Sequence, residues 1–181
     1  VFLDGAGASF ESVVVSGNVA TVGAGVWMGA SDALFAFVDV TGNRATATAG
    51  GMYVDERAEA VVTGGIVYGN ADASTDRYAA NLREVPGSQV RVERSIVEGW
   101  TGAGATDMGG NMDVAPGFVA PLDPARAPSV GGDFHLVVGS PAVDRGPVAS
   151  GATMDMERFP RARDGDGDGV AQPDIGAFAA D

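Results

Sequence analysis

Two stretches of the chain, "FESVVVSGN" (Phe10–Asn18) and "FAFVDVTGN" (Phe35–Asn43), share one pattern at a separation of 25 positions. Two later stretches continue the series: "IVYGN" (Ile66–Asn70) and a degraded copy, "IVEGW" (Ile96–Trp100). The same turn position is thus occupied by Asn18, Asn43, Asn70 and Trp100. Similarity at a nearly fixed period is the mark of a repeat architecture, in which similar coils stack on one another. The growing gaps between copies indicate loops that lengthen on one face.

Each repeat has the composition of strands and not of helices. Short β-branched and aromatic runs end at Gly-Asn pairs, whose residues tolerate left-handed backbone angles. No sustained apolar stripe of helical period is present. The sequence therefore predicts an all-β fold, a right-handed parallel β-helix of about four to six coils. Equivalent asparagines would form a ladder of side-chain amides.

About four coils are expected in residues 5–100, with five apolar side chains inside: Val13, Val15, Phe37, Ile66 and Ile96. The alternative is an antiparallel sandwich with regular turns. A sandwich gives no reason for the same turn chemistry to recur in every repeat, and so the β-helix is favoured.

The chain is expected to be one domain in two parts, with the coils in residues 1–100 and a loop-rich closing segment in residues 101–181. Residues 101–133 are rich in Gly, Pro and Ala, and "PLDPARAP" (Pro121–Pro128) cannot support a central strand. An open solenoid end exposes unpaired strand edges, and so the closing segment is expected to cap one end. The first coil is expected to be covered by upstream coils or by another subunit.

The downstream half also resembles a known family. "GGDFHLVVGSPAVDRG" (Gly131–Gly146) and "DGDGDGVAQPDIGAF" (Asp164–Phe178) resemble the ending of choice-of-anchor Q type β-helix proteins. The coils are similar, more loosely, to the repeats of polymorphic outer-membrane proteins. The chain departs from the family at Ala179, where Glu is usual, and at "APGF" (Ala115–Phe118), where an Asp-Pro-apolar-Phe run is commoner. The resemblance implies a parallel β-helix in a secreted or cell-surface protein.

Composition narrows the possible partners. The formal net charge is −13, and all 11 basic residues are Arg. Such a surface repels nucleic acid and anionic membranes. There is no Cys, and no uninterrupted apolar run approaches the length of a membrane span. We expect no nucleic-acid partner and no direct membrane insertion.

The run "DGDGDG" (Asp164–Gly169) predicts a calcium loop. Asp164, Asp166 and Asp168 fall at positions 1, 3 and 5, and Gly169 at position 6, of the pattern used by EF-hand loops. The Val170 carbonyl would be the ligand at position 7, and Asp174 the closing carboxylate. Position 12 is Ile175 instead of Glu, and no helices flank the run, so a loop site on a β scaffold is expected. A solvated acidic turn without metal is the alternative.

No catalytic residue is assigned. His135, the only histidine, alternates with apolar neighbours and has no evident partner. The coil acids form no pair at equivalent positions of neighbouring coils: Asp39, Asp55, Glu56 and Glu59. Trp27 and Tyr53 occupy the same repeat position and are expected to stack, as a packing ladder or as a sugar platform.

These observations favour a non-enzymatic, secreted or cell-surface structural or adhesin-type module that is stabilised by calcium and contacts a glycan or another surface protein. The alternative is a carbohydrate-binding or polysaccharide-degrading β-helix protein, which should show a cleft with convergent acids or an acid and an Arg.

Overall fold

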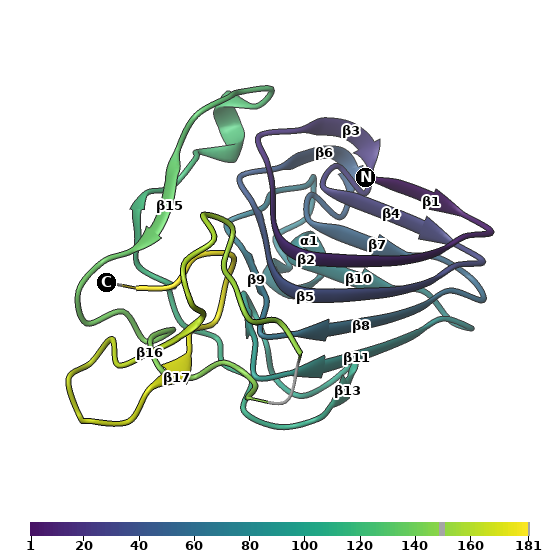
Figure 1. Cartoon of the computed structure of the whole chain (residues 1–181). Coiled ribbons are helices and arrows are strands. Elements are labelled where there is room, and N and C mark those ends of the chain that lie inside the picture. Colours follow the sequence, from purple (N-terminus) through teal and green to yellow (C-terminus); the bar gives the residue numbers. More distant parts are fainter. Residues whose placement is uncertain (149–150, 181) are drawn as a thin grey trace.

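The computed structural model describes residues 1–148 and 151–180, and its coils form a parallel β-solenoid of about four turns (Figure 1). The first coil contains β1 (Phe2–Asp4), β2 (Gly7–Ser16) and β3 (Val19–Val22). The second contains β4 (Val26–Gly29), β5 (Asp32–Thr41) and β6 (Arg44–Thr48). The third contains β7 (Met52–Val54), β8 (Glu59–Thr63) and β9 (Ile66–Tyr68). The fourth contains β10 (Leu82–Glu84), β11 (Gln89–Glu93) and β12 (Ile96–Val97).

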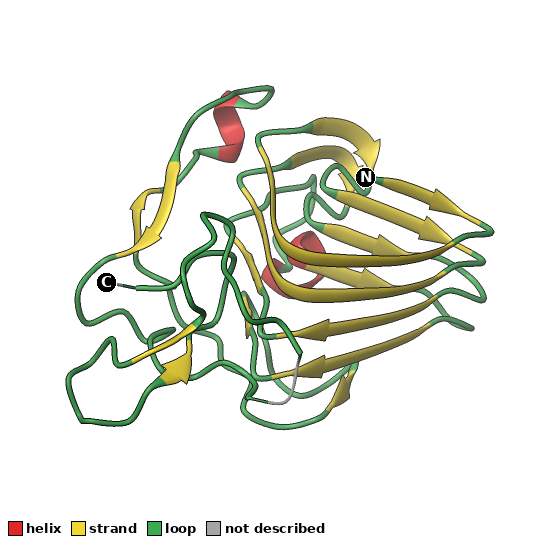
Figure 2. Cartoon of the chain, viewed as in Figure 1, coloured by secondary structure: helices red, strands yellow, loops and turns green. Residues whose placement is uncertain are grey.

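Consecutive repeats pair in parallel, which confirms the predicted fold class and excludes the antiparallel sandwich. One sheet runs β1-β4-β7-β10, and a second runs from β2 through β5, β8 and β11 to β13 (Thr106–Asp107). Strand β5 is long enough to pair with both β8 and β9, and β12 follows β9. A short third sheet joins β3 to β6. Figure 2 shows the strands of successive coils lying one above another.

A bend in the second sheet recurs at the same level of all four coils. The bend residues all have a positive φ: Ser12 (53°), Phe37 (53°), Gly64 (62°) and Arg94 (41°). The paired register skips this position, passing from Glu11↔Ala36 to Val13↔Val38. A residue in the left-handed region reverses the alternation of side chains, so residues on either side of the bend can both face the interior. This bend divides the long strand into two faces.

Two apolar clusters result. The interior of the coils contains in-register rows such as Val26, Met52 and Leu82, all fully buried. Phe10 stacks on Phe35 with ring centroids 5.0 Å apart. The second cluster lies between the coils and the closing segment. Its fully buried or nearly buried members are Ile66, Ile96, Phe118, Phe134, Ala142 and Ile175.

The predicted interior side chains divide between these environments. Val15 lies in the interior cluster, and Val13 packs against it while partly buried. Ile66 and Ile96 are buried as predicted, but they face outward into the second cluster. Phe37 is also fully buried, and its ring lies beneath the guanidinium of Arg161 from the closing segment, 4.0 Å from the ring centroid. The bend explains the difference, because it turns these positions away from the interior.

The amide ladder is present at the predicted asparagines. Nδ2 of Asn18 donates to Oδ1 of Asn43 at 2.9 Å, and Nδ2 of Asn43 donates to Oδ1 of Asn70 at 2.9 Å. The next acceptor is Asn81, at 2.9 Å, and its Nδ2 donates to the carboxylate of Glu98 at 3.1 Å. The expected fourth position, Trp100, is not a rung. Asn81 ends the short helix α1 (Arg77–Asn81), which is inserted between the third and fourth coils.

The first part of the closing segment stacks on the fourth coil through β13, but the rest lies along one flank of the coils and not across their end, where a cap was expected (Figure 1). It contacts the first coil through Ser129, the second through Leu122 and the third through Gly176. Its regular elements after β13 are few: β14 (Phe118–Ala120), η1 (Pro124–Arg126), β15 (Asp133–Leu136), β16 (Ala162–Arg163) and β17 (Gln172–Pro173). Strands β14 and β15 pair antiparallel, as do β16 and β17.

Candidate functional site

The acidic run forms the loop between the paired strands β16 and β17. Asp164 organises it, because Oδ1 accepts the Gly167 amide at 2.8 Å and Oδ2 accepts the Gly169 amide at 2.9 Å. Both glycines have a positive φ, 78° and 91°. The glycines therefore let the chain turn tightly around one carboxylate.

The other two aspartates of the loop also accept backbone amides. Oδ1 of Asp166 accepts the Asp168 amide at 3.0 Å, and Oδ1 of Asp168 accepts the Val170 amide at 2.8 Å. These short-range bonds are typical of aspartates in turns. They fix the shape of the loop, while each carboxylate oxygen retains further acceptor capacity.

The structure groups Asp164 and Asp166 with Asp144, a residue that the sequence analysis missed. One ligand atom from each of the three lies within 4.8 Å of the others. Asp144 belongs to the turn "SPAVDRG" (Ser140–Gly146) and is buried, whereas Asp164 and Asp166 are exposed. Its separation from the run, 22 residues from Asp166, hides it from any reading of local spacing.

Three of the predicted ligands lie outside this group. Asp168 is exposed, and no described group of three acids includes it. Another is the carbonyl of Val170, a backbone atom of an exposed residue and not an acid. Asp174 is 2% exposed, and its carboxylate accepts the amides of Asp144, at 2.7 Å, and of Ala180. Burial raises the pKa of Asp174, while these two amides act in the opposite direction. Asp174 therefore fastens the Asp144 turn and the end of the closing segment.

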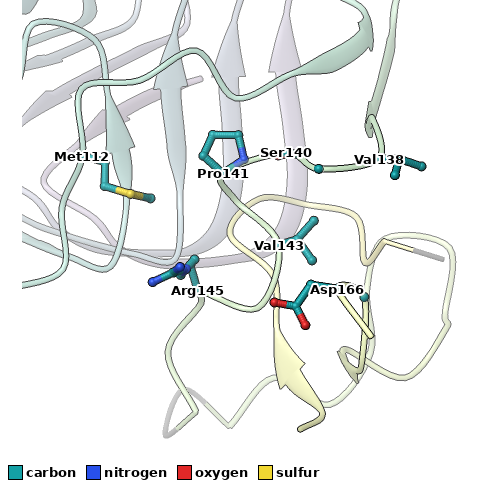
Figure 3. A pocket seen from close by; sticks show the side chains of 9 residues that line it. Met112, Val138, Ser140, Pro141, Val143, Arg145 and Asp166 are labelled. Atoms are coloured by element: carbon teal, nitrogen blue, oxygen red, sulfur yellow. The ribbon is translucent and has the colours of Figure 1, made fainter. Parts of the chain in front are cut away.

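A cavity of about 560 Å³ adjoins the acidic group (Figure 3). Met112, Pro141 and Val143 give it apolar walls, and Arg145 and Asp166 contribute charged side chains of opposite sign. Met112 comes from the chain that follows β13, where it bridges to Ile96 of the fourth coil. The cavity thus lies where the last coil, the Asp144 turn and the acidic loop meet.

A second polar cluster joins the closing segment to the bend of the coils. Asp39 is fully buried; its Oδ1 accepts the Ala177 amide at 3.2 Å, and its Oδ2 has no hydrogen-bond partner. Arg161, 1% exposed, donates to the carbonyls of Gly176 and Ala177, both at 2.9 Å, and to Oγ of Ser12 at 2.7 Å. Burial raises the pKa of Asp39 to about 8, although the Ala177 amide and the charge of Arg161 lower it.

The remaining candidates have structural partners. His135 lies between Asp133, 2.6 Å from Nδ1, and Glu157, 3.3 Å from Nε2, and its ring contacts Phe178. The hydrogen bond from Asp133 raises the pKa of His135. Glu59 pairs with Arg91 across neighbouring coils at 3.5 Å, with both side chains partly exposed.

The aromatic position of the first sheet forms an in-register row. Trp27 lies beside Tyr53, and Phe2 stacks on Trp27 with centroids 4.6 Å apart and planes at 9°. In this parallel arrangement the face of Trp27 is occupied by its neighbour, which agrees better with a packing ladder than with a sugar platform.

In comparisons with known proteins, no family model, no curated protein and no solved structure matches this chain. The described residues contain no helix that is both long and apolar enough to cross a membrane.

Proposed function

We propose that this chain is a non-enzymatic structural module of a secreted or cell-surface protein, of the stalk or adhesin kind. The observation that supports it best is the continuous register of the coils, from the apolar row of Val26, Met52 and Leu82 to the amide ladder. A parallel solenoid with such ladders is a stiff rod whose surface is regular along its length. The proposed secreted or surface location rests on the family resemblance alone, and no matching family model supports that resemblance.

The partner would be a glycan, another surface protein, or a further coil stacked on the first. Strands β1, β2 and β3 pair on one side only, with β4, β5 and β6. Phe2, at this edge, is 71% exposed. Unpaired strand edges favour addition of another strand, so this edge is where a stacked neighbour would bind.

The experiment that tests the non-enzymatic role is an activity screen of the whole chain. It would be incubated with neutral and uronate-containing polysaccharides, and new reducing or unsaturated ends would be measured. We expect none above the buffer blank, together with slow proteolysis of the coils. Release of new ends that depends on protein concentration and is lost in Glu59→Gln or Asp55→Asn would overturn the proposal.

Carbohydrate binding without cleavage is the second candidate, and the cavity beside Arg145 favours it. A guanidinium, a carboxylate and apolar walls in one cavity are suited to a sugar that carries a carboxylate. Titration with oligogalacturonate would test this, with Arg145→Gln expected to abolish binding and the exposed Arg126→Gln expected to leave it unchanged. Equal binding by both variants would exclude the cavity as the site.

Calcium is the cofactor that we propose for the closing segment. Its role would be to hold the acidic loop and not to support the coils, whose ladders contain no part of that loop. Failure of the calcium proposal would therefore leave the structural role of the coils standing.

A further inference from the structure

The Asp144 carboxylate has an acceptor that the protein does not use. The residue is 7% exposed, and its Oδ1 is buried without a hydrogen-bond partner. Its Oδ2 accepts the Asp166 amide at 3.0 Å. A buried carboxylate oxygen without a partner is costly, because the group has lost water and gained nothing in return. The described residues supply no hydrogen-bond donor to this atom, so the unsatisfied acceptor points to a ligand that the chain does not provide.

The fold holds the Asp144 carboxylate next to the acidic loop by several independent contacts. Asp144 has a positive φ of 55°, and its own amide donates to Asp174 at 2.7 Å. The end of the same turn is held by the Gly146 amide, which donates to the Pro173 carbonyl at 2.7 Å. These hydrogen bonds fix the backbone on both sides of the Asp144 side chain and so fix where its carboxylate lies.

The loop approaches the turn closely because one of its residues is glycine. A Cβ on Gly165 would lie 2.8 Å from Cγ1 of Val143, which no real side chain tolerates. Gly165 stands between Asp164 and Asp166, so both carboxylates are brought to the turn by the same close approach. Three carboxylates from two distant parts of the chain then meet within 4.8 Å.

We infer that Asp144, Asp164 and Asp166 form a calcium site that joins the Ser140–Gly146 turn to the acidic loop. The inference refines the calcium proposal above by naming the ligands, and it replaces Asp168, Val170 and Asp174 of the sequence-based set with Asp144. All three ligands are carboxylate oxygens, which hard cations prefer over transition metals. Exposed Asp164 and Asp166 leave room for water in the remaining positions of an ion that takes six to eight oxygens.

Charge supports the same assignment. Three carboxylates within 4.8 Å repel one another. Among residues 1–148 and 151–180, no ion pair joins any of the three to a cationic side chain. A divalent cation neutralises two of the three charges and fills the empty acceptor of Asp144. The ion would then act as a cross-link between two loops that share no strand pairing.

The test is calorimetric titration of the metal-stripped whole chain with calcium, paired with thermal unfolding at millimolar calcium. We expect binding heat and a rise in Tm for the natural chain. The isosteric variant Asp144→Asn should weaken calcium affinity at least about tenfold. The matched variant Asp168→Asn, which changes the neighbouring loop aspartate, should leave affinity within about twofold.

Each outcome decides the assignment. Loss of affinity in Asp168→Asn but not in Asp144→Asn would overturn it in favour of the sequence-based set. No calcium heat and no change in Tm in the natural chain would overturn the site altogether, while the activity screen of the coils would be unaffected. If Asp144→Asn does not fold, Asp164→Asn, an exposed change, provides the second measurement, and unchanged affinity there would also overturn the site.

Discussion

In residues 1–100 each coil repeats the hydrogen-bond register of the coil before it. In the described part of residues 101–180, β13 and a bridge at Met112 continue that register briefly, two short antiparallel pairs follow, and the rest is joined to the coils by isolated contacts. The coils distribute their stability over many equivalent rows. The closing segment concentrates it in a few side chains, among them Arg161 and Asp174. A single substitution in the coils should therefore disturb only its own row. A substitution of one of these few side chains should loosen the whole closing segment.

Replacement of Arg161 is expected to have the largest effect. Arg161→Ala removes the contact with Phe37 and the bonds to Gly176, Ala177 and Ser12, and it leaves Asp39 without its nearest cation. Removing one member of a buried charged network costs about 3–5 kcal/mol. Hydrogen exchange should show the closing segment exposed while the coil amides stay protected. The exposed Arg126→Ala should change neither, and loss of coil protection together with the closing segment would refute the separation.

The corresponding substitution within the coils is in the amide ladder. Asn43→Ala deletes a fully buried rung that accepts from Asn18 and donates to Asn70, and unfolding should become easier by about 2–3 kcal/mol. Asn18→Ala, at the exposed end of the ladder, is the matched control and should cost well under half of that. Urea denaturation measures the free energy of unfolding of both variants. Equal losses would show that the contribution of a rung to stability does not depend on its burial.

Asp39 should make the attachment of the closing segment depend on pH. Its pKa is raised to about 8 in the folded chain from an ordinary value near 4, so the folded state holds a proton that the unfolded state releases. This stability is fully present below pH 4 and is lost as the pH rises to about 8. We expect the free energy of unfolding to fall across that window by up to about 1.4 kcal/mol per pH unit, the slope for one proton.

Asp39→Asn is the variant that isolates this effect. It should flatten the pH dependence of unfolding between pH 4 and 8, and Asp32→Asn, an exposed change on the same strand, should not. An unchanged slope in Asp39→Asn would assign the pH dependence to other groups.

The smallest effect is expected at His135. Hydrogen bonds to Asp133 and Glu157 raise its pKa, so its protonated form adds stability below about pH 6.5 that is lost as the pH rises through the folded pKa. Both acids are about half-exposed, and solvent screening keeps this gain small. NMR titration of this single histidine gives the pKa directly, and Asp133→Asn should move it toward its ordinary value.

The difference between the two regions also determines how much of each could be predicted from the sequence. The spacing of the repeats predicted the parallel coils and the rungs at Asn18, Asn43 and Asn70, because the same sequence pattern occurs several times. It misplaced Ile66 and Ile96, since alternation alone cannot reveal a bend at Phe37 or Gly64 that reverses it. The interior and the outer cluster use the same residue types.

The acidic site was predictable only in part, for a related reason. Asp164 and Asp166 share a loop, and local spacing identified them. Asp144 reaches them through a turn positioned by Asp174 and by the close approach of Gly165. Neither contact leaves a periodic trace in the sequence. The positive φ of Asp144, a tolerated conformation for aspartate, gives no signal that distinguishes it from other turn residues.

Helix α1 bears on how such a protein can be rebuilt. The amide ladder passes from Asn43 to Asn70 across 27 residues, but from Asn70 to Asn81 across only 11, because the inserted helix supplies the next rung in place of a repeat position. The third coil can therefore not be exchanged with the second as an interchangeable part. A recombinant that moves the third coil must also carry the helix and its acceptor Glu98. One junction in this repeat array is therefore specific to its position.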